Sequence, residues 1–281
     1  MRNASVVPVL MYHHVRPGAG MIAATPEHFE DQLKWLEKNR YTTLTTAQFA
    51  RHLRGEGVPR KSVLLTFDDG YLDNWVYAYP LLKEYGFKAA IFLVTSWIHS
   101  GPVRPCLGQE TDLPDTPEHR ACEALIEQGR SDEVALRWDE IREMRASGLV
   151  EFHSHTHTHT RWDLGGTAAE KNTRMTDELA QSRAALATHL GEVSDHFCWP
   201  QGYFDADYVN IANEAGFRYL YTTDAFDQNR AGGDPAHISR FAVRNTTGAS
   251  VGRRIVVAAH PVIGPVFNRW KRWKRSQRAP Q

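Results

Sequence analysis

Cysteine is scarce in this chain and is not arranged for disulfide bonds. The 281 residues include three cysteines, Cys106, Cys122 and Cys198, which lie far apart in the sequence and form no CxxC pair. An odd and sparse set argues against a disulfide framework and fits a reducing compartment. A domain of this length also buries enough surface to be stable without such crosslinks.

Long hydrophobic runs are absent as well. No stretch approaches the ~18 apolar residues of a transmembrane helix. The N-terminal apolar run over residues 6–12 contains Pro8 and is followed directly by His13 and His14, unlike the longer apolar segment of a secretory signal. We therefore expect a cytoplasmic protein.

The chain has no excess of either charge, because 33 Lys and Arg residues balance 33 Asp and Glu residues. A neutral total gives no reason to expect nucleic-acid binding. The C-terminal end is nevertheless basic, through Arg269, Lys271, Arg272, Lys274, Arg275 and Arg278. Together with the neighbouring Phe and Trp residues, these cations suit peripheral contact with an anionic membrane. Such contact would place the protein at the inner face of the membrane. A disordered, solvated basic tail explains the same composition equally well.

Short apolar runs that alternate with helical patterns indicate parallel β/α units. We expect strands at residues 6–12, 62–67, 89–95, 149–152, 197–199, 219–223 and 238–243. The segments between them carry helical patterns, the longest over residues 167–190. The sequence therefore predicts one α/β domain of about seven strand–helix units. Polar clusters recur at the carboxyl ends of the strands, which favours a barrel over an open sheet.

The strongest local motif is Thr66-Phe67-Asp68-Asp69-Gly70, where two carboxylates follow a buried strand. Glycine permits the backbone to turn sharply after them. Adjacent side chains project differently, so one carboxylate can bind a cation while the other acts as a base. A turn followed by a helix N-cap would use the same residues for structure alone.

Four alternating histidines form the second motif, at positions 153, 155, 157 and 159. Imidazole is a common metal ligand, and with carboxylate oxygen it suits Zn²⁺ or a related divalent ion. Two histidines and one carboxylate would leave positions open for water and substrate. A solvated polar loop is the alternative interpretation.

The third motif is Phe197-Cys198-Trp199-Pro200-Gln201-Gly202. An apolar strand that runs into Pro-x-Gly makes a rigid turn whose backbone amides can point into a pocket and stabilise an oxyanion. On its own the motif is equally typical of an ordinary turn.

In this order the three motifs resemble the polysaccharide deacetylase family, carbohydrate esterase family four, also described as the NodB-homology domain. The resemblance runs from about residue 6 to residue 244, and the opening PVLMYHHV is similar to the branch of poly-β-1,6-N-acetylglucosamine deacetylases. It implies a distorted (β/α)7 barrel in a single domain. We expect the catalytic domain to occupy residues 1–250 and a C-terminal extension with the basic tail to occupy residues 251–281.

The resemblance also implies roles for individual residues. Asp68 corresponds to the catalytic base and Asp69 to the metal-binding aspartate. His155 and His159 correspond to the paired metal ligands, because Ser154-His155-Thr156 matches the family pattern, although His153 with His157 offers a second register. The metal implied is divalent, most simply Zn²⁺, with Co²⁺ or Ni²⁺ as alternatives.

The oxyanion donor corresponds to the backbone amide of Gln201. Cys198 stands where many members carry an arginine that orients the base, so the group that orients Asp68 is not identified. His260, the last histidine in the chain, is the candidate for the general acid. His13 and His14 are also placed to reach the pocket.

The function implied is metal-dependent removal of acetyl from an N-acetylated sugar in a polysaccharide, lipopolysaccharide or lipid-linked precursor. The expected absence of an export signal favours a biosynthetic intermediate. Two alternatives stay open: an amidohydrolase that acts on a non-sugar acyl substrate, and a carbohydrate-binding protein without turnover, which the missing arginine motivates.

Overall fold

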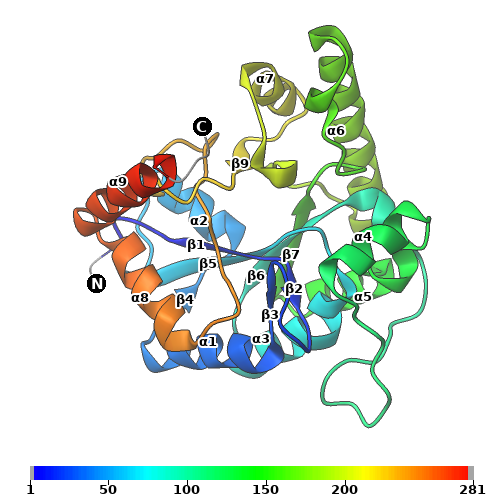
Figure 1. Ribbon diagram of the computed structural model, residues 1–281, viewed down its shortest axis with the longest axis horizontal. Coiled ribbons are helices and arrows are strands. Elements are labelled where there is room, and N and C mark those ends of the chain that lie inside the picture. The colour runs from blue at the N-terminus through cyan, green and yellow to red at the C-terminus, as the bar shows by residue number, and fades with distance from the viewer. Residues whose placement is uncertain (1–2, 278–281) are drawn as a thin grey trace.

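A parallel sheet curves through the centre of the molecule and carries helices on its outside (Figure 1). The computed structural model describes residues 3–277, so Arg278 of the predicted basic tail lies outside the described residues. Along the sheet the strands are β10 (Phe241–Ala242), β1 (Val9–Tyr12), β5 (Ser62–Phe67), β6 (Ala89–Leu93), β7 (Val150–Ser154), β8 (His196–Cys198) and β9 (Tyr219–Tyr221). All neighbours on this path are parallel, and the short strand β4 (Thr42–Thr43) adds to β5.

One segment connects the two edges of the sheet. Ile238 forms a parallel bridge to Tyr221 of β9, and five residues later the Val243 N–H donates to Met11 O of β1 at 2.9 Å. The sheet is thereby closed into a barrel-like shape. The predicted distorted (β/α)7 barrel in a single domain is confirmed.

The helices surround the sheet, and most of them bury one apolar stripe against the protein. They are α1 (Pro26–Lys38), α2 (Thr46–Leu53), α3 (Tyr79–Tyr85), α4 (His119–Glu127), α5 (Trp138–Ala146), α6 (Ala168–Leu190), α7 (Ala206–Glu214), α8 (Gly248–Ala259) and α9 (Ile263–Ser276). In α1 the Thr25 side chain caps the first turn and Pro26 opens the helix, so Phe29, Leu33 and Leu36 face the core.

Three details differ from the expected elements. The first strand begins at Val9, after Pro8, which has no N–H for a sheet. The helix expected from residue 74 opens with a π-helical turn, Asn74–Ala78, before α3 begins. Two further short strands, β2 (His14–Val15) and β3 (Ala23–Ala24), pair with each other beyond the end of β1.

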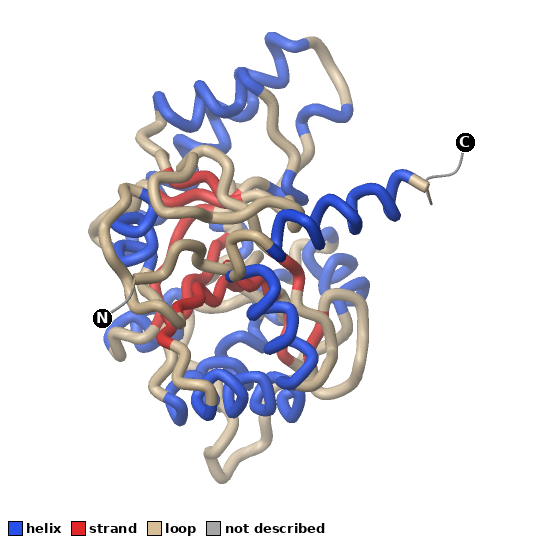
Figure 2. The backbone as a smooth tube through the Cα atoms, turned by 90° about the vertical axis from the view of Figure 1, so that its left-hand side faces the viewer, coloured by secondary structure: helices blue, strands red, loops and turns tan. Residues whose placement is uncertain are grey.

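The C-terminal region is helical rather than a disordered tail, with its last helix ending at Ser276. The boundary expected between residues 250 and 251 falls inside α8, which packs on α1 so closely that a Cβ on Gly252 would lie 2.1 Å from the Trp35 ring. Helix α9 then extends away from the barrel (Figure 2). Within residues 3–277, no helix has the length and apolar character needed to span a membrane.

Candidate active site

The carboxyl ends of the strands surround a pocket of about 390 Å³. Parallel strands bring their carboxyl ends to one edge, which is why motifs far apart in sequence meet here. Six of the residues singled out from the sequence line this pocket: His13, Asp68, Asp69, His155, His159 and Gln201.

Asp69, His155 and His159 form a group whose ligand atoms lie within 4.8 Å of one another. The Nε2 atoms of His155 and His159 lie 3.4 Å and 3.6 Å from Asp69 Oδ1. That oxygen is buried and has no hydrogen-bond partner among the described residues. A buried carboxylate oxygen left unsatisfied between two imidazole nitrogens fits a bound cation.

The tautomer of His155 is consistent with this role. Its Nδ1 lies 2.8 Å from Cys198 O, and a carbonyl oxygen can only accept, so the Nδ1 atom carries the proton. The Nε2 atom that faces Asp69 is then unprotonated in the neutral ring and free to bind a metal. A metal-ligating histidine commonly donates its other N–H in this way.

The second histidine register is not brought together. His153 Nδ1 lies 2.5 Å from Ser194 Oγ, and His157 Nδ1 lies 2.9 Å from Thr95 Oγ1. Since neither residue belongs to a metal-binding group in the described part of the chain, the geometry favours His155 with His159.

The loop that carries these histidines is clamped from α6. Glu178, which is buried, accepts hydrogen bonds from the backbone N–H groups of His157 at 2.8 Å and Thr158 at 2.7 Å. Thr156 and His159 have positive φ angles of 68° and 64°, values that non-glycine residues rarely adopt. The clamp therefore holds a strained loop in the shape that aims His159 at Asp69.

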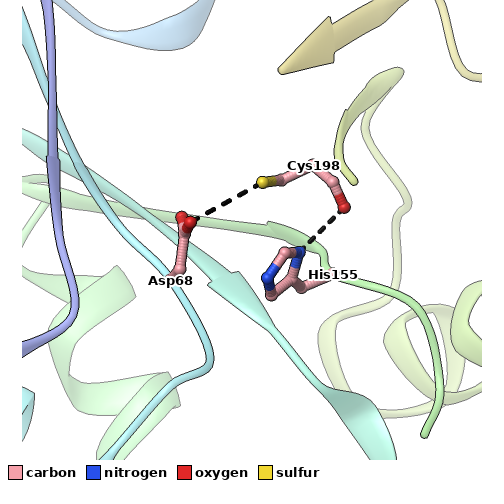
Figure 3. A group of neighbouring side chains, drawn as sticks. All are labelled: Asp68, His155 and Cys198. Carbon is pink, nitrogen blue, oxygen red and sulfur yellow. Dashed lines mark hydrogen bonds between the residues drawn. The ribbon is translucent and has the colours of Figure 1, made fainter. Parts of the chain in front are cut away.

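Asp68 points to a different partner. The buried Arg240, which lies within the closing segment of the sheet, donates from Nη1 to Asp68 Oδ1 at 2.6 Å and from Nη2 to Oδ2 at 2.8 Å. Cys198 lies beside this pair, with its sulfur 2.9 Å from Arg240 Nη2. The same sulfur lies 3.8 Å from Asp68 Oδ2 (Figure 3). The orienting arginine missing from the third motif is thus supplied by another element.

This pairing assigns different tasks to the two aspartates. Burial by itself raises the pKa of Asp68, but the charges of Arg240 and His155 outweigh it and hold the pKa below the usual 3.8. Asp68, His155 and Cys198 also lie close enough together to suggest a metal site. Because both Asp68 oxygens are engaged by Arg240, the Asp69 group is the better cation site.

Gln201 lies at the rim of the pocket in a tight turn, Pro200–Gly202, with a φ of 53°. The next residue has to be glycine, since a Cβ on Gly202 would lie 2.1 Å from Thr223 Oγ1. The turn therefore packs tightly against the end of β9 and holds the Gln201 backbone beside the pocket.

The three remaining candidate histidines have separate positions. His13 lines the pocket, with Nε2 3.8 Å from Asp68 Oδ2, and burial lowers its pKa although Asp68 and Asp69 raise it. His14 is buried against Asp73, 2.5 Å away, and takes a structural role.

The structure does not bring His260 to the site. It is exposed at the end of α8, where Nδ1 accepts the N–H groups of Val262 and Ile263 at 3.2 Å and 3.1 Å. His260 is therefore not placed to act as the general acid, because a helix-capping side chain outside the pocket cannot reach a substrate there.

Residues 55–220 match the family model described as polysaccharide deacetylase. The chain belongs to the polysaccharide deacetylase family. The matched segment contains both aspartates, the histidine loop and the Gln201 turn, whereas His13 and Arg240 lie outside it.

Individual relatives agree with this family. The Bacillus subtilis protein YxkH, which carries the name of a polysaccharide deacetylase, is 28% identical over 220 residues, covering 78% of this chain and 64% of its own length. The Escherichia coli poly-beta-1,6-N-acetyl-D-glucosamine N-deacetylase is 24% identical over 246 residues, covering 77% of this chain and 34% of its own length. The chain therefore spans less than two thirds of either relative.

Solved structures share the fold. IcaB from Ammonifex degensii superposes with a TM-score of 0.70 at 24% identity, covering 90% of this chain and 98% of its own. The Streptococcus pyogenes deacetylase PplD, solved with acetate, also gives a TM-score of 0.70, at 21% identity, covering 90% of this chain and 99% of its own. The barrel of this chain is thus shared with both structures over 90% of its residues.

Proposed function

We propose that this chain is a metal-dependent hydrolase that removes the acetyl group from an N-acetylated sugar. The observation that carries the proposal is the division of labour between two adjacent carboxylates. Asp69 presents an unsatisfied oxygen to two histidines, whereas Asp68 is held by Arg240. A cation site with a separate base beside it is what hydrolysis of an amide requires.

A divalent cation held by Asp69, His155 and His159 would polarise the acetyl carbonyl and make water at the site more acidic. Two imidazoles and a carboxylate suit Zn²⁺, with Co²⁺ or Ni²⁺ as alternatives.

The residues of the chain complete the reaction. Asp68 accepts a proton from the attacking water, while Arg240 keeps its carboxylate ionised and oriented. The Gln201 backbone N–H donates to the oxyanion that forms as water adds to the carbonyl. His13 donates a proton to the nitrogen as the C–N bond breaks, so acetate and a free amine leave.

For the substrate we propose an N-acetylhexosamine in a polysaccharide, a lipopolysaccharide or a lipid-linked precursor. The name of the Escherichia coli relative supports the sugar, and the rings of Tyr71 and Trp97 line the pocket where a sugar would lie. The alternative of a binding protein without turnover was based on the missing arginine. Arg240 now provides a guanidinium beside Asp68, so that argument no longer supports it.

The test is acetate release from N-acetylhexosamine oligomers, lipid-linked N-acetyl sugars and simple non-sugar acetamides, after chelation and after adding back Zn²⁺, Co²⁺ or Ni²⁺. We expect metal-restored release from a sugar substrate and none from the Asp69→Asn variant. Release from the non-sugar amides alone would replace the proposal with the amidohydrolase alternative. No acetate release from any of these substrates, with metal bound, would contradict the proposal.

A further inference from the structure

Helix α9 has two opposite faces, and one of them packs on the body of the protein. Gly264 and Asn268 are buried, and Arg272 Nη2 donates to Phe226 O at 3.4 Å. These residues repeat every fourth position and so form one stripe along the helix. Gly264 lies so near the barrel that a Cβ there would be 2.2 Å from Gln228 Nε2. This stripe fixes the helix to the body of the protein.

The opposite face of α9 is apolar and open to solvent. The exposed fractions are 52% for Ile263, 67% for Val266 and 44% for Trp270. Together with Val262 and Phe267 these side chains line one shallow hollow. At ~100° per residue, positions 263, 266 and 270 lie within a single stripe on the side away from Gly264 and Asn268. A contiguous apolar surface of this kind marks an interaction site.

Cations border the apolar stripe on both sides. Arg269 and Lys271 flank it, and Lys274 lies at its C-terminal end, with Nζ 4.6 Å from the centre of the Trp270 ring. The sequence from residue 261 to residue 277 contains no Asp or Glu. The surface therefore combines apolar area with positive charge, and it carries no acidic side chain that would repel an anionic partner.

We infer that α9 docks on the surface of an anionic lipid bilayer, with Ile263, Val266 and Trp270 at the level of the headgroups. An amphipathic helix with a Trp-containing apolar face and cationic edges lies in the plane of such a surface. A second copy of the chain fits less well, because two cationic helices would repel each other. A nucleic acid would use the cations but would leave the apolar stripe without a partner.

The test is sedimentation of the full-length protein with vesicles of phosphatidylcholine alone or with about one third phosphatidylglycerol. We expect binding to the anionic vesicles, little binding to neutral ones, and release at high salt. Lys271→Gln with Lys274→Gln should weaken binding about 30-fold, at roughly five-fold per cation. Ile263→Ser with Val266→Ser should weaken it at least tenfold without changing the charge, since burying even one such side chain strengthens binding by about tenfold or more.

The matched control removes two cations from elsewhere on the surface. Arg60→Gln with Arg218→Gln, both at exposed positions, should bind vesicles like the wild type. All variants should keep their helical circular dichroism, and each should keep wild-type hydrolysis of a soluble substrate. The inference is overturned if anionic vesicles are not bound at low salt, or if the control loses binding as strongly as the α9 variants. It is also overturned if the apolar variant abolishes a dimer or the basic variant abolishes only DNA or RNA binding.

Discussion

Replacement of Arg240 by methionine separates the orientation of the base from the binding of metal. The Arg240 side chain is fully buried and makes two hydrogen bonds to Asp68, which is also buried. Removing one partner of a buried ion pair leaves an uncompensated charge and costs about 3–5 kcal/mol of stability. The carboxyl of Asp68 can avoid part of this cost by taking up a proton, which disables it as a base.

The variant should therefore show two effects. Its free energy of unfolding in denaturant should fall by about 3–5 kcal/mol or somewhat less. Acetate release at neutral pH should fall, and the acidic limb of the pH profile of kcat/KM should move to higher pH. The sign follows from the Asp68 pKa, which Arg240 holds below 3.8, so removing the guanidinium raises the pH at which the base is ionised. Metal content should not change, because Asp69, His155 and His159 are untouched.

Two comparisons make this prediction refutable. Arg244→Met removes an exposed arginine from the same segment and should leave both stability and activity near wild type. Adding Asp68→Asn to Arg240→Met should recover part of the lost stability, since no carboxylate remains buried without a partner. A fully active Arg240→Met enzyme with an unshifted pH profile would refute the assigned role.

Three other residues give separate predictions. His13→Gln should lower kcat by ~10²–10⁴-fold with metal content unchanged, and an unaffected kcat would move the general acid elsewhere. Glu178→Gln should weaken metal affinity by ~10–100-fold in a chelator competition, because Glu178 accepts the loop N–H groups; equal affinity would show that the clamp is dispensable. His153, whose pKa burial lowers from 6.5 to about 3, stays neutral in the fold while the unfolded chain takes up a proton. Unfolding free energy should then fall as pH drops below about 6.5, by up to ~1.4 kcal/mol per unit, and His153→Gln should show a smaller slope.

The barrel and the metal group followed from local patterns in the sequence. A buried strand such as residues 62–67 is visible as an apolar run, and in parallel units the carboxyl end of each strand must face the same edge. Asp68, Asp69, His155 and His159 could therefore be brought together before any coordinates were known. The choice between His155/His159 and His153/His157 needed a resemblance, because alternation alone allows both registers.

The orienting group could not be found this way. Arg240 is separated from Asp68 by 172 residues and reaches it only because the segment from Ile238 to Val243 closes the barrel. One signal was present: an arginine in the mostly apolar expected strand at residues 238–243 has to be paired if it is buried. The role of Glu178 could not be predicted from the sequence, since a glutamate in a long helix is ordinary.

The C-terminal helix was missed for a different reason. Its apolar positions at 263, 266 and 270 follow a helical period, but the density of Lys and Arg around them also fits a solvated tail. Composition could not decide between the two, whereas the buried Gly264 and Asn268 fix the helix to the barrel.

The most direct test of the proposed reaction is acetate release by Asp68→Asn beside the wild type, on one N-acetylhexosamine substrate and at equal bound metal. Both Asp68 oxygens accept hydrogen bonds from Arg240 and Asp68 is not one of the three cation-binding residues, so the variant should keep its metal. It should still fold, with a lower free energy of unfolding because Arg240 loses its charged partner. We predict a fall in kcat of ~10²–10⁴-fold or more, the share of a general base. Near-wild-type acetate release by Asp68→Asn would contradict the account.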